Sequence, residues 1–217
     1  GNTVVADKDE DGTRTGSVAT FKVGDGLYDD QTDTLLERNV IAGNTVEAET
    51  VNYTAGNYNA VSGDKVTADK QFVVNLGTVD ADNRDNNTTV KNSVFTAGGV
   101  AGTDAASTIN GELTAANTVS VADGALKLTG DLLVLDESTV TSQWLNLGGN
   151  TLFIDPSYVW TGSVTTQDLT DTDTLDGDVI VGEGSAFYIG AADSANNDIA
   201  NVSALKSYLA SSDYDSV

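Results

Sequence analysis

The feature that most constrains this chain is a rhythm of short Val-, Leu- and Ile-rich runs, cut at close intervals by Gly, Asn or Asp. It is clearest between Thr118 and Pro156, where VSV, ALKL, LLVL, WLNL and TLFI are separated by turn-forming residues. Alternating apolar side chains in runs of this length are typical of β-strands, and Gly, Asn and Asp tolerate the backbone angles of tight turns. The sequence therefore predicts an all-β protein made of many short strands.

The number of runs separates two all-β architectures. A sandwich or barrel uses about seven to ten strands joined by hairpins, whereas a β-solenoid uses more and shorter strands with a repeat of about 20–25 residues. Many short runs, among them residues 34–42, 45–53 and 118–121, favour a single-strand β-solenoid, or parallel β-helix. The segments AGNTV, AANTV and GGNTL share one pattern, so we expect them at equivalent positions of successive coils, with Asn and Thr stacked in ladders.

The expected solenoid covers residues 1–191. At the spacing of paired strands it would form a rod about 40–50 Å long, with about eight to ten turns. Residues 192–217 depart from the pattern, and Asn197–Leu209 places Ile199, Val202 and Leu205 near one helical face. We expect a short helix there that caps the last coil or leads into a further domain.

Composition excludes several functions. The net charge of −23, from 33 acidic and 10 basic residues, excludes nucleic acid as a partner and disfavours anionic membranes. The absence of Cys and His excludes disulfides, thiolate metal sites, Cys nucleophiles and a Ser-His-Asp triad. A chain without Cys is compatible with bacterial export. With no starting Met, no signal peptide and no long apolar run, we expect a mature protein or an excised fragment that does not insert in a membrane.

The strongest metal motif is the segment Asp7-Lys8-Asp9-Glu10-Asp11-Gly12. Carboxylates at alternate positions followed by Gly resemble the head of a calcium loop, but an EF-hand would require Glu where Val18 stands. Asp7, Asp9 and Asp11 are therefore a weak calcium candidate, and the alternative is a solvated acidic turn. We expect no other cofactor. Two weaker acidic groups are Asp80, Asp82 and Asp85, and Asp171, Asp173, Asp176 and Asp178.

The aromatic residues allow two interpretations. Trp144, Tyr158 and Trp160 fit a core or capping role near the last coils, although stacked aromatics also form sugar platforms. Tyr53, Tyr58 and Phe72 would form either an internal stack or an exposed stripe. The N-x-S/T triplets carry no strong glycosylation signal in a bacterial export setting; they begin at Asn52, Asn86, Asn87 and Asn201.

Two segments resemble a known family. Leu145–Tyr158 follows the pattern L-x-φ-x-G-G-x-L-φ-φ-D-P-x-(Y/W), and Gly177–Gly190 follows G-x-φ-φ-V-G-x-x-S-x-φ-x-φ-G, where φ is an apolar residue. Both are similar to passenger segments of type V autotransporters from Gram-negative bacteria. The resemblance implies a secreted, surface-displayed right-handed β-helix, usually followed by an outer-membrane β-barrel, and such passengers serve as adhesins, self-association factors, toxins or enzymes.

We therefore expect a non-enzymatic, secreted bacterial surface protein that mediates adhesion or self-association. Its partner would be a ligand on a host or neighbouring cell, or a second copy of the chain. One alternative is a structural subunit of an extracellular filament or surface layer. The other is a polysaccharide-active β-helix enzyme with paired carboxylates, which the scarcity of Lys and Arg disfavours.

Overall fold

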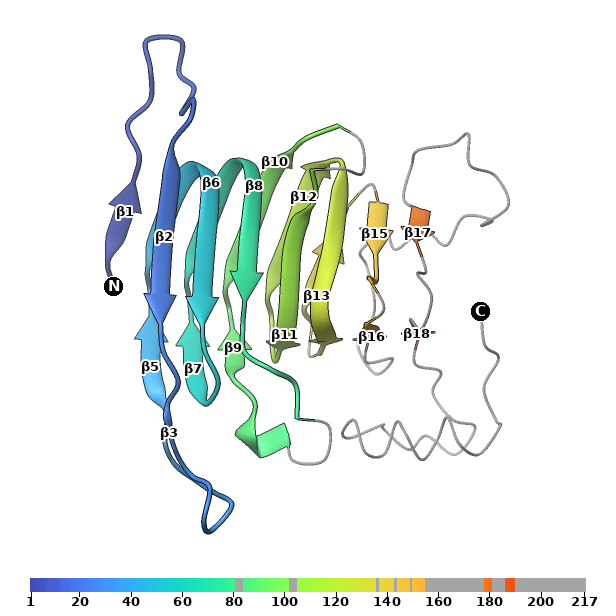
Figure 1. Ribbon diagram of the computed structural model, residues 1–217. Coiled ribbons are helices and arrows are strands. Elements are labelled where there is room, and N and C mark those ends of the chain that lie inside the picture. The colour runs from blue at the N-terminus through green and yellow to red at the C-terminus, as the bar shows by residue number, and fades with distance from the viewer. Residues whose placement is uncertain are drawn as a thin grey trace.

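The computed structural model describes residues 1–80, 84–101, 105–135, 137–142, 144–148, 150–154, 178–180 and 186–189. Within them the chain is built of β-strands and one short 3-10 helix, η1 (Arg84–Asn86), so the all-β prediction is confirmed for this part of the protein. Most strands pair in parallel and form one curled sheet (Figure 1). The predicted cap at residues 192–217 lies outside the described residues.

The parallel strands are arranged in three columns, in which each strand pairs with the strand from the next pass of the chain. The first column contains β1 (Thr3–Val5), β6 (Thr45–Ala55), β8 (Lys65–Asn75), β10 (Val94–Gly99), β12 (Thr118–Asp123) and β14 (Thr139–Thr141). The second column contains β2 (Val18–Val23), β6, β8, β11 (Ser107–Leu113), β13 (Ala125–Val134), β15 (Trp144–Asn146) and β17 (Asp178–Ile180). The third column contains β5 (Asn39–Ala42), β7 (Asn59–Ser62) and β9 (Thr89–Lys91).

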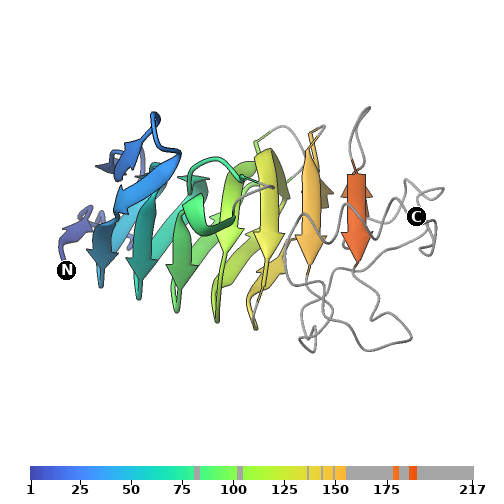
Figure 2. The ribbon, with the colours of Figure 1, turned by 90° about the horizontal axis from the view of Figure 1, so that it is seen from below.

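The first two columns meet because β6 and β8 belong to both. Their pairing register shifts between Ala48 and Thr50 of β6, because the partners of these residues in β8, Ala68 and Gln71, are one residue further apart. This β-bulge marks the point where the two strands pass from the first column to the second. Figure 2, seen from below with the stack running across the picture, shows the strands of successive passes side by side. Four further strands complete the described part of the chain. β16 (Thr151–Ile154) pairs with β13 and with β18 (Ala186–Ile189), and β3 (Leu27–Asp29) forms an antiparallel hairpin with β4 (Thr34–Glu37).

A buried ladder of polar side chains marks the start of each pass. The backbone N–H of Asn44 donates to Oδ1 of Asp64 at 2.8 Å, and the N–H of Asp64 donates to Oγ of Ser93 at 3.2 Å. The ladder continues from Ser93 to Asn117 at 3.0 Å and from Asn117 to Ser138 at 3.2 Å. The linked residues are 20, 29, 24 and 21 positions apart in the chain. These spacings agree with the predicted repeat, apart from the inserted loop that precedes β9.

The ladder tests the predicted equivalence of the three Asn-Thr segments. AGNTV and AANTV do occupy one column position, since Thr45, Lys65, Val94 and Thr118 are in register. GGNTL does not, because Leu152 of that segment pairs with Leu132 at the far end of β13. Its Asn150 closes a turn by donating from Nδ2 to the carbonyl oxygens of Leu128 and Leu147. The prediction was therefore wrong for GGNTL.

The core lies between the columns and consists of the alternate, inward-facing side chains of the strands. Val46, Val66, Phe95 and Val119 stack at one level of the first column, and all are fully buried. In the second column, a stack of Val51, Phe72 and Leu126 runs parallel to a stack of Tyr53, Val74, Ile109 and Leu128. Stacking of like side chains at the strand spacing excludes water from a long, narrow interior.

One predicted strand is divided in two. Residues 34–42 read as a single run, but the chain turns at Arg38 between β4 and β5. Its guanidinium donates to the carbonyl oxygens of Asn59, Asn87 and Asp85, and thereby joins three backbone segments. Burial lowers the pKa of Arg38, but three carbonyl acceptors compensate for the lost hydration.

Candidate functional site

Two insertions and one turn meet at the lower edge of the sheet as drawn in Figure 1, and residues of the turn and of one insertion line a cavity there. The insertions are the β3–β4 hairpin and the loop of residues 76–88, and the turn is residues 56–58, between β6 and β7. The cavity has a volume of about 360 Å³. Its lining consists of Asn57, Tyr58, Thr78, Val79, Asp80, Asn86 and Asn87.

Three asparagines hold together the segments around the cavity, which we call its rim. Oδ1 of Asn57 accepts a hydrogen bond from the N–H of Thr78 at 2.7 Å. Asn87 accepts from the N–H of Asp80 at 2.6 Å and donates to the buried Glu112 at 2.9 Å. Nδ2 of Asn86 donates to the phenol oxygen of Tyr28 at 3.3 Å. Each amide therefore links two segments that are distant in the sequence.

The aromatic residue of the lining is Tyr58, which stacks on Tyr28 of the hairpin. The rings of Tyr28 and Tyr58 lie 4.6 Å apart and are nearly parallel, at 4°. The hydroxyl of Tyr28 donates to Oδ1 of Asp33, and this bond, with burial and the nearby charge, raises the pKa of Tyr28 to about 12. The pKa of Tyr58 is also raised, first by burial and then by Asp30, Asp25, Asp80 and Asp33. The carboxylates thus give this edge a negative potential.

Close backbone packing holds the rim in place. A Cβ at Gly26 would overlap the carbonyl oxygen of Tyr58, and one at Gly77 would lie 2.8 Å from Oδ1 of Asn57. Gly77 also has φ of +82°, a conformation that glycine adopts without strain. Glycine at both positions lets the hairpin, the turn and the loop converge.

A buried ion pair supports the floor of the loop. Glu112 is 3% exposed, and its carboxylate receives two hydrogen bonds from the Arg84 guanidinium, from Nη2 at 2.7 Å and Nε at 3.3 Å. Asn87 adds the third donor. A carboxylate neutralised and bonded in this way acts as an anchor, because the polar partners offset the cost of removing its charge from water.

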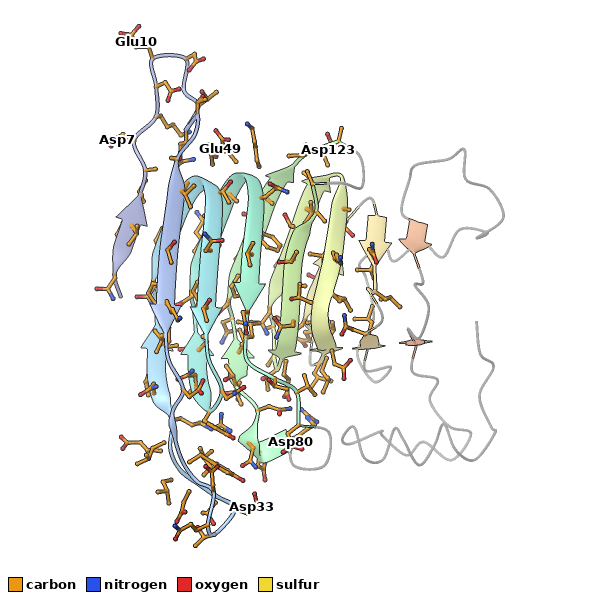
Figure 3. All side chains as sticks on the ribbon, in the orientation of Figure 1. Asp7, Glu10, Asp33, Glu49, Asp80 and Asp123 are labelled. Atoms are coloured by element: carbon orange, nitrogen blue, oxygen red, sulfur yellow. The ribbon has the colours of Figure 1, made fainter. Side chains whose placement is uncertain are left out.

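The predicted calcium loop lies at the opposite edge. Figure 3 shows Asp7 and Glu10 on a loop that extends beyond the sheet, away from Glu49. The hydroxyl of Thr13 donates to Asp11 at 3.1 Å and is 3.3 Å from Asp9, so these two carboxylates flank a hydroxyl. In the part of the chain that the structure describes, no group of three or more His, Cys, Asp or Glu side chains could hold a metal ion. Calcium binding by Asp7, Asp9 and Asp11 stays a prediction.

Arg14 attaches this loop to the sheet. Its side chain is 7% exposed and contacts Glu47 of β6 at 2.5 Å, Asp69 of β8 at 2.7 Å and the carbonyl oxygen of Ala6 at 3.1 Å. One guanidinium therefore separates two carboxylates on adjacent strands that would otherwise repel each other.

The other sequence candidates are dispersed. Tyr53 and Phe72 are fully buried, whereas Tyr58 is half-buried beside Tyr28, so the three residues form no common stack. Asp80 lines the cavity and Asp85 lies in η1, while Asp82 is outside the described residues. Trp144 begins β15, and Asp178 begins β17. The remaining candidates also lie outside the described residues; they are Tyr158, Trp160, Asp171, Asp173, Asp176 and Asn201.

The cavity itself was not predicted. Asn86 and Asn87 were noted only as N-x-S/T triplets, and Asn52, the first such residue, lies on the outer face of β6. The sequence signals that point to the cavity are Asn57-Tyr58, which follows Gly56, and the adjacent pair Asn86-Asn87.

Comparisons with protein-family models, curated proteins and solved structures found no match. No helix among the described residues is long and apolar enough to cross a membrane.

Proposed function

We propose that this chain is a passenger-type, right-handed β-solenoid from a secreted bacterial surface protein, and that it acts without catalysis in adhesion or self-association. The observation that carries the proposal is the regular polar outer surface of the curled sheet. On the second column, Thr20, Asn52, Val73, Thr108, Lys127 and Asn146 are in register across successive strands; of these, Val73 is apolar and the Thr108 hydroxyl is buried. On the first column, Glu47, Thr67, Thr96, Ser120 and Thr141 form an equivalent row.

These rows suit binding by many weak contacts. Hydroxyl and amide groups donate and accept hydrogen bonds, and the stack holds them at the regular spacing of paired strands. A partner with a similar repeat would engage several of them at once, so that avidity replaces the affinity of a single deep pocket. The family resemblance at Leu145–Tyr158 and Gly177–Gly190 supports display on a bacterial surface.

Clustering of protein-coated beads tests this function. Beads that carry the chain are expected to cluster with each other or to bind cells, and free chain in solution should compete. A variant with Thr67→Glu, Thr96→Glu and Ser120→Glu adds charge to the first row and should abolish the clustering. Beads that neither cluster nor bind cells, or a variant that clusters like the original chain, would contradict the proposal.

A filament or surface-layer subunit is the second candidate, favoured by the first strands of the stack. Val4, Val5, Val18 and Val40 lie on β1, β2 and β5 and are 41% to 79% exposed. In the described part of the chain, each of these strands pairs on one side only, with β6 or β7. End-to-end pairing of copies would cover these valines. Electron microscopy of the concentrated chain tests this, and a uniform population of single rods would contradict it.

A further inference from the structure

The cavity beside Tyr58 contains polar groups that the fold does not use. Oδ1 of Asn57 is occupied by Thr78, but within the described residues its Nδ2 makes no hydrogen bond. In the same part of the chain, Oδ1 of Asn86 and the hydroxyl of Tyr58 have no hydrogen-bond partner either. The cavity thus offers a donor, an acceptor and a hydroxyl that does both.

The charges around the cavity restrict the ligand. Asp25, Asp30, Asp33 and Asp80 face the Tyr58 phenol closely enough to disfavour its ionisation. Two guanidinium groups of this edge are engaged elsewhere, Arg38 with three backbone carbonyl oxygens and Arg84 with Glu112. The carboxylates that act on Tyr58 would repel an anionic ligand, so the cavity disfavours phosphate, sulfate, sialic acid and uronic acid.

The shape and lining restrict it further. A volume of about 360 Å³ lies at the small end of the range for ligand sites and fits one or two sugar rings. Sugar hydroxyls both donate and accept, as the unused amide groups and the phenol require, and the C–H face of a sugar ring packs on an aromatic side chain. Close packing at Gly26 and Gly77 and the hydrogen bonds of the asparagine side chains hold the segments around the cavity together. A site that is already ordered loses little entropy on binding.

We propose that this cavity binds a neutral saccharide, with Asn57 and Asn86 as hydrogen-bonding residues and Tyr58 as the aromatic wall. The proposal is independent of self-association, because the cavity lies at the edge formed by the insertions and not on the polar rows.

The test uses the purified chain on a glycan array that carries neutral, sialylated and uronate-containing oligosaccharides. Neutral glycans should be retained and acidic ones should not. Retention of no neutral glycan, or preferential retention of acidic glycans, would overturn the proposal.

Two variants then locate the site, with the best-retained neutral oligosaccharide as the probe in calorimetric titration. Asn57→Asp keeps the acceptor for Thr78 but removes the donor, and should weaken binding about tenfold. Asn52→Asp adds the same charge on the outer face of β6 and should leave affinity unchanged. Tyr58→Phe keeps the ring and removes the hydroxyl, and should weaken binding severalfold even if Asn57→Asp does not fold. Wild-type affinity in whichever of these two variants folds would place the saccharide elsewhere and overturn the assignment.

Discussion

The phenol of Tyr53 donates a 2.6 Å hydrogen bond to Oδ2 of Asp64, and both residues are buried in the interior of the stack. Asp64 also accepts hydrogen bonds from the backbone N–H and the side-chain Nδ2 of Asn44. Its carboxylate is 1% exposed and has no cationic partner among the described residues, so neutral donors stabilise its charge. Burial, followed by this hydrogen bond, raises the pKa of Tyr53 far above its ordinary value.

The first prediction concerns this pair. Asp64→Ala leaves the Tyr53 hydroxyl and Asn44 Nδ2 buried without an acceptor, and should lower the free energy of unfolding by about 3 kcal/mol. Tyr53→Phe removes one bond to a charged acceptor and should cost about 2 kcal/mol. Urea unfolding measures both. The matched control is Tyr58→Phe. The Tyr58 hydroxyl has no hydrogen-bond partner within the described residues, so this variant should change stability by less than about 0.5 kcal/mol. Equal losses for the two Phe variants would be inconsistent with the Tyr53–Asp64 bond.

The second prediction concerns the attachment of the acidic loop. Arg14→Ala leaves Glu47 and Asp69 as neighbouring carboxylates without their shared cation, and should destabilise the chain by about 2–3 kcal/mol. Limited proteolysis should then cut the loop of residues 6–17 first. Lys70→Ala breaks the pair with Glu49, in which Lys70 is largely exposed, and should cost about 0.5 kcal/mol or less. Similar losses from the two variants would show that Arg14 is not an anchor.

The third prediction concerns the residue that precedes each ladder position. Gly43 and Ala116 both have positive φ, at 64° and 53°. Gly43→Ala places a side chain in a left-handed conformation with no compensating contact, and should cost about 1 kcal/mol. Ala116→Gly relieves the same strain, which offsets the greater entropy of the unfolded chain, and should be neutral or stabilise by up to about 1 kcal/mol. Thermal unfolding of both variants measures the difference, and a stabilising Gly43→Ala would contradict the shared geometry.

The fourth prediction concerns pH. The pKa of Tyr28 is about 12 in the folded chain against an ordinary value of 10.0, because its hydroxyl is bonded to Asp33. The folded state therefore holds this proton more tightly, and the resulting stabilisation is present below about pH 10 and is lost as the pH rises toward 12. Tyrosinate absorbance should show one group that titrates near pH 12 and disappears in Tyr28→Phe. Titration of this group at its ordinary pKa would mean that the Tyr28 hydroxyl is not bonded to Asp33.

The sequence predicted the strands and part of the ladder. The other ladder positions could not be predicted, for a physical reason. Asn44 and Asn117 were recognisable because both precede Thr and an apolar residue. Asp64, Ser93 and Ser138 occupy the same position, but they differ in residue type because any small side chain with an acceptor oxygen satisfies the next backbone N–H. The ladder arises because successive passes place these residues one above another. The sequence reveals it only at positions that share the same residue type.

The cavity depended on information that no local pattern contains. Asn57, Thr78 and Asn86 become neighbours only when β6, β8 and β9 are in register, because each belongs to a different turn or insertion. The burial of Glu112 was equally unpredictable, since its partner Arg84 is 28 residues away in a loop that the strand pattern does not position. In a chain of net charge −23, the sequence predicts that acidic residues are exposed to solvent. Only tertiary contacts identify the acidic residues that are buried and paired.

Self-association is the central claim, and sedimentation velocity over a salt series tests it most directly. Charges of −23 on each copy repel strongly at about 0.01 M salt, where the Debye length is about 30 Å, and weakly at about 0.15 M, where it is about 8 Å. We predict a monomer at low salt that shifts to larger species as NaCl or CaCl₂ is added, and no shift in the triple variant Thr67→Glu, Thr96→Glu and Ser120→Glu. A chain that remains monomeric throughout, or clusters that dissolve steadily as salt and calcium are added, would contradict the account.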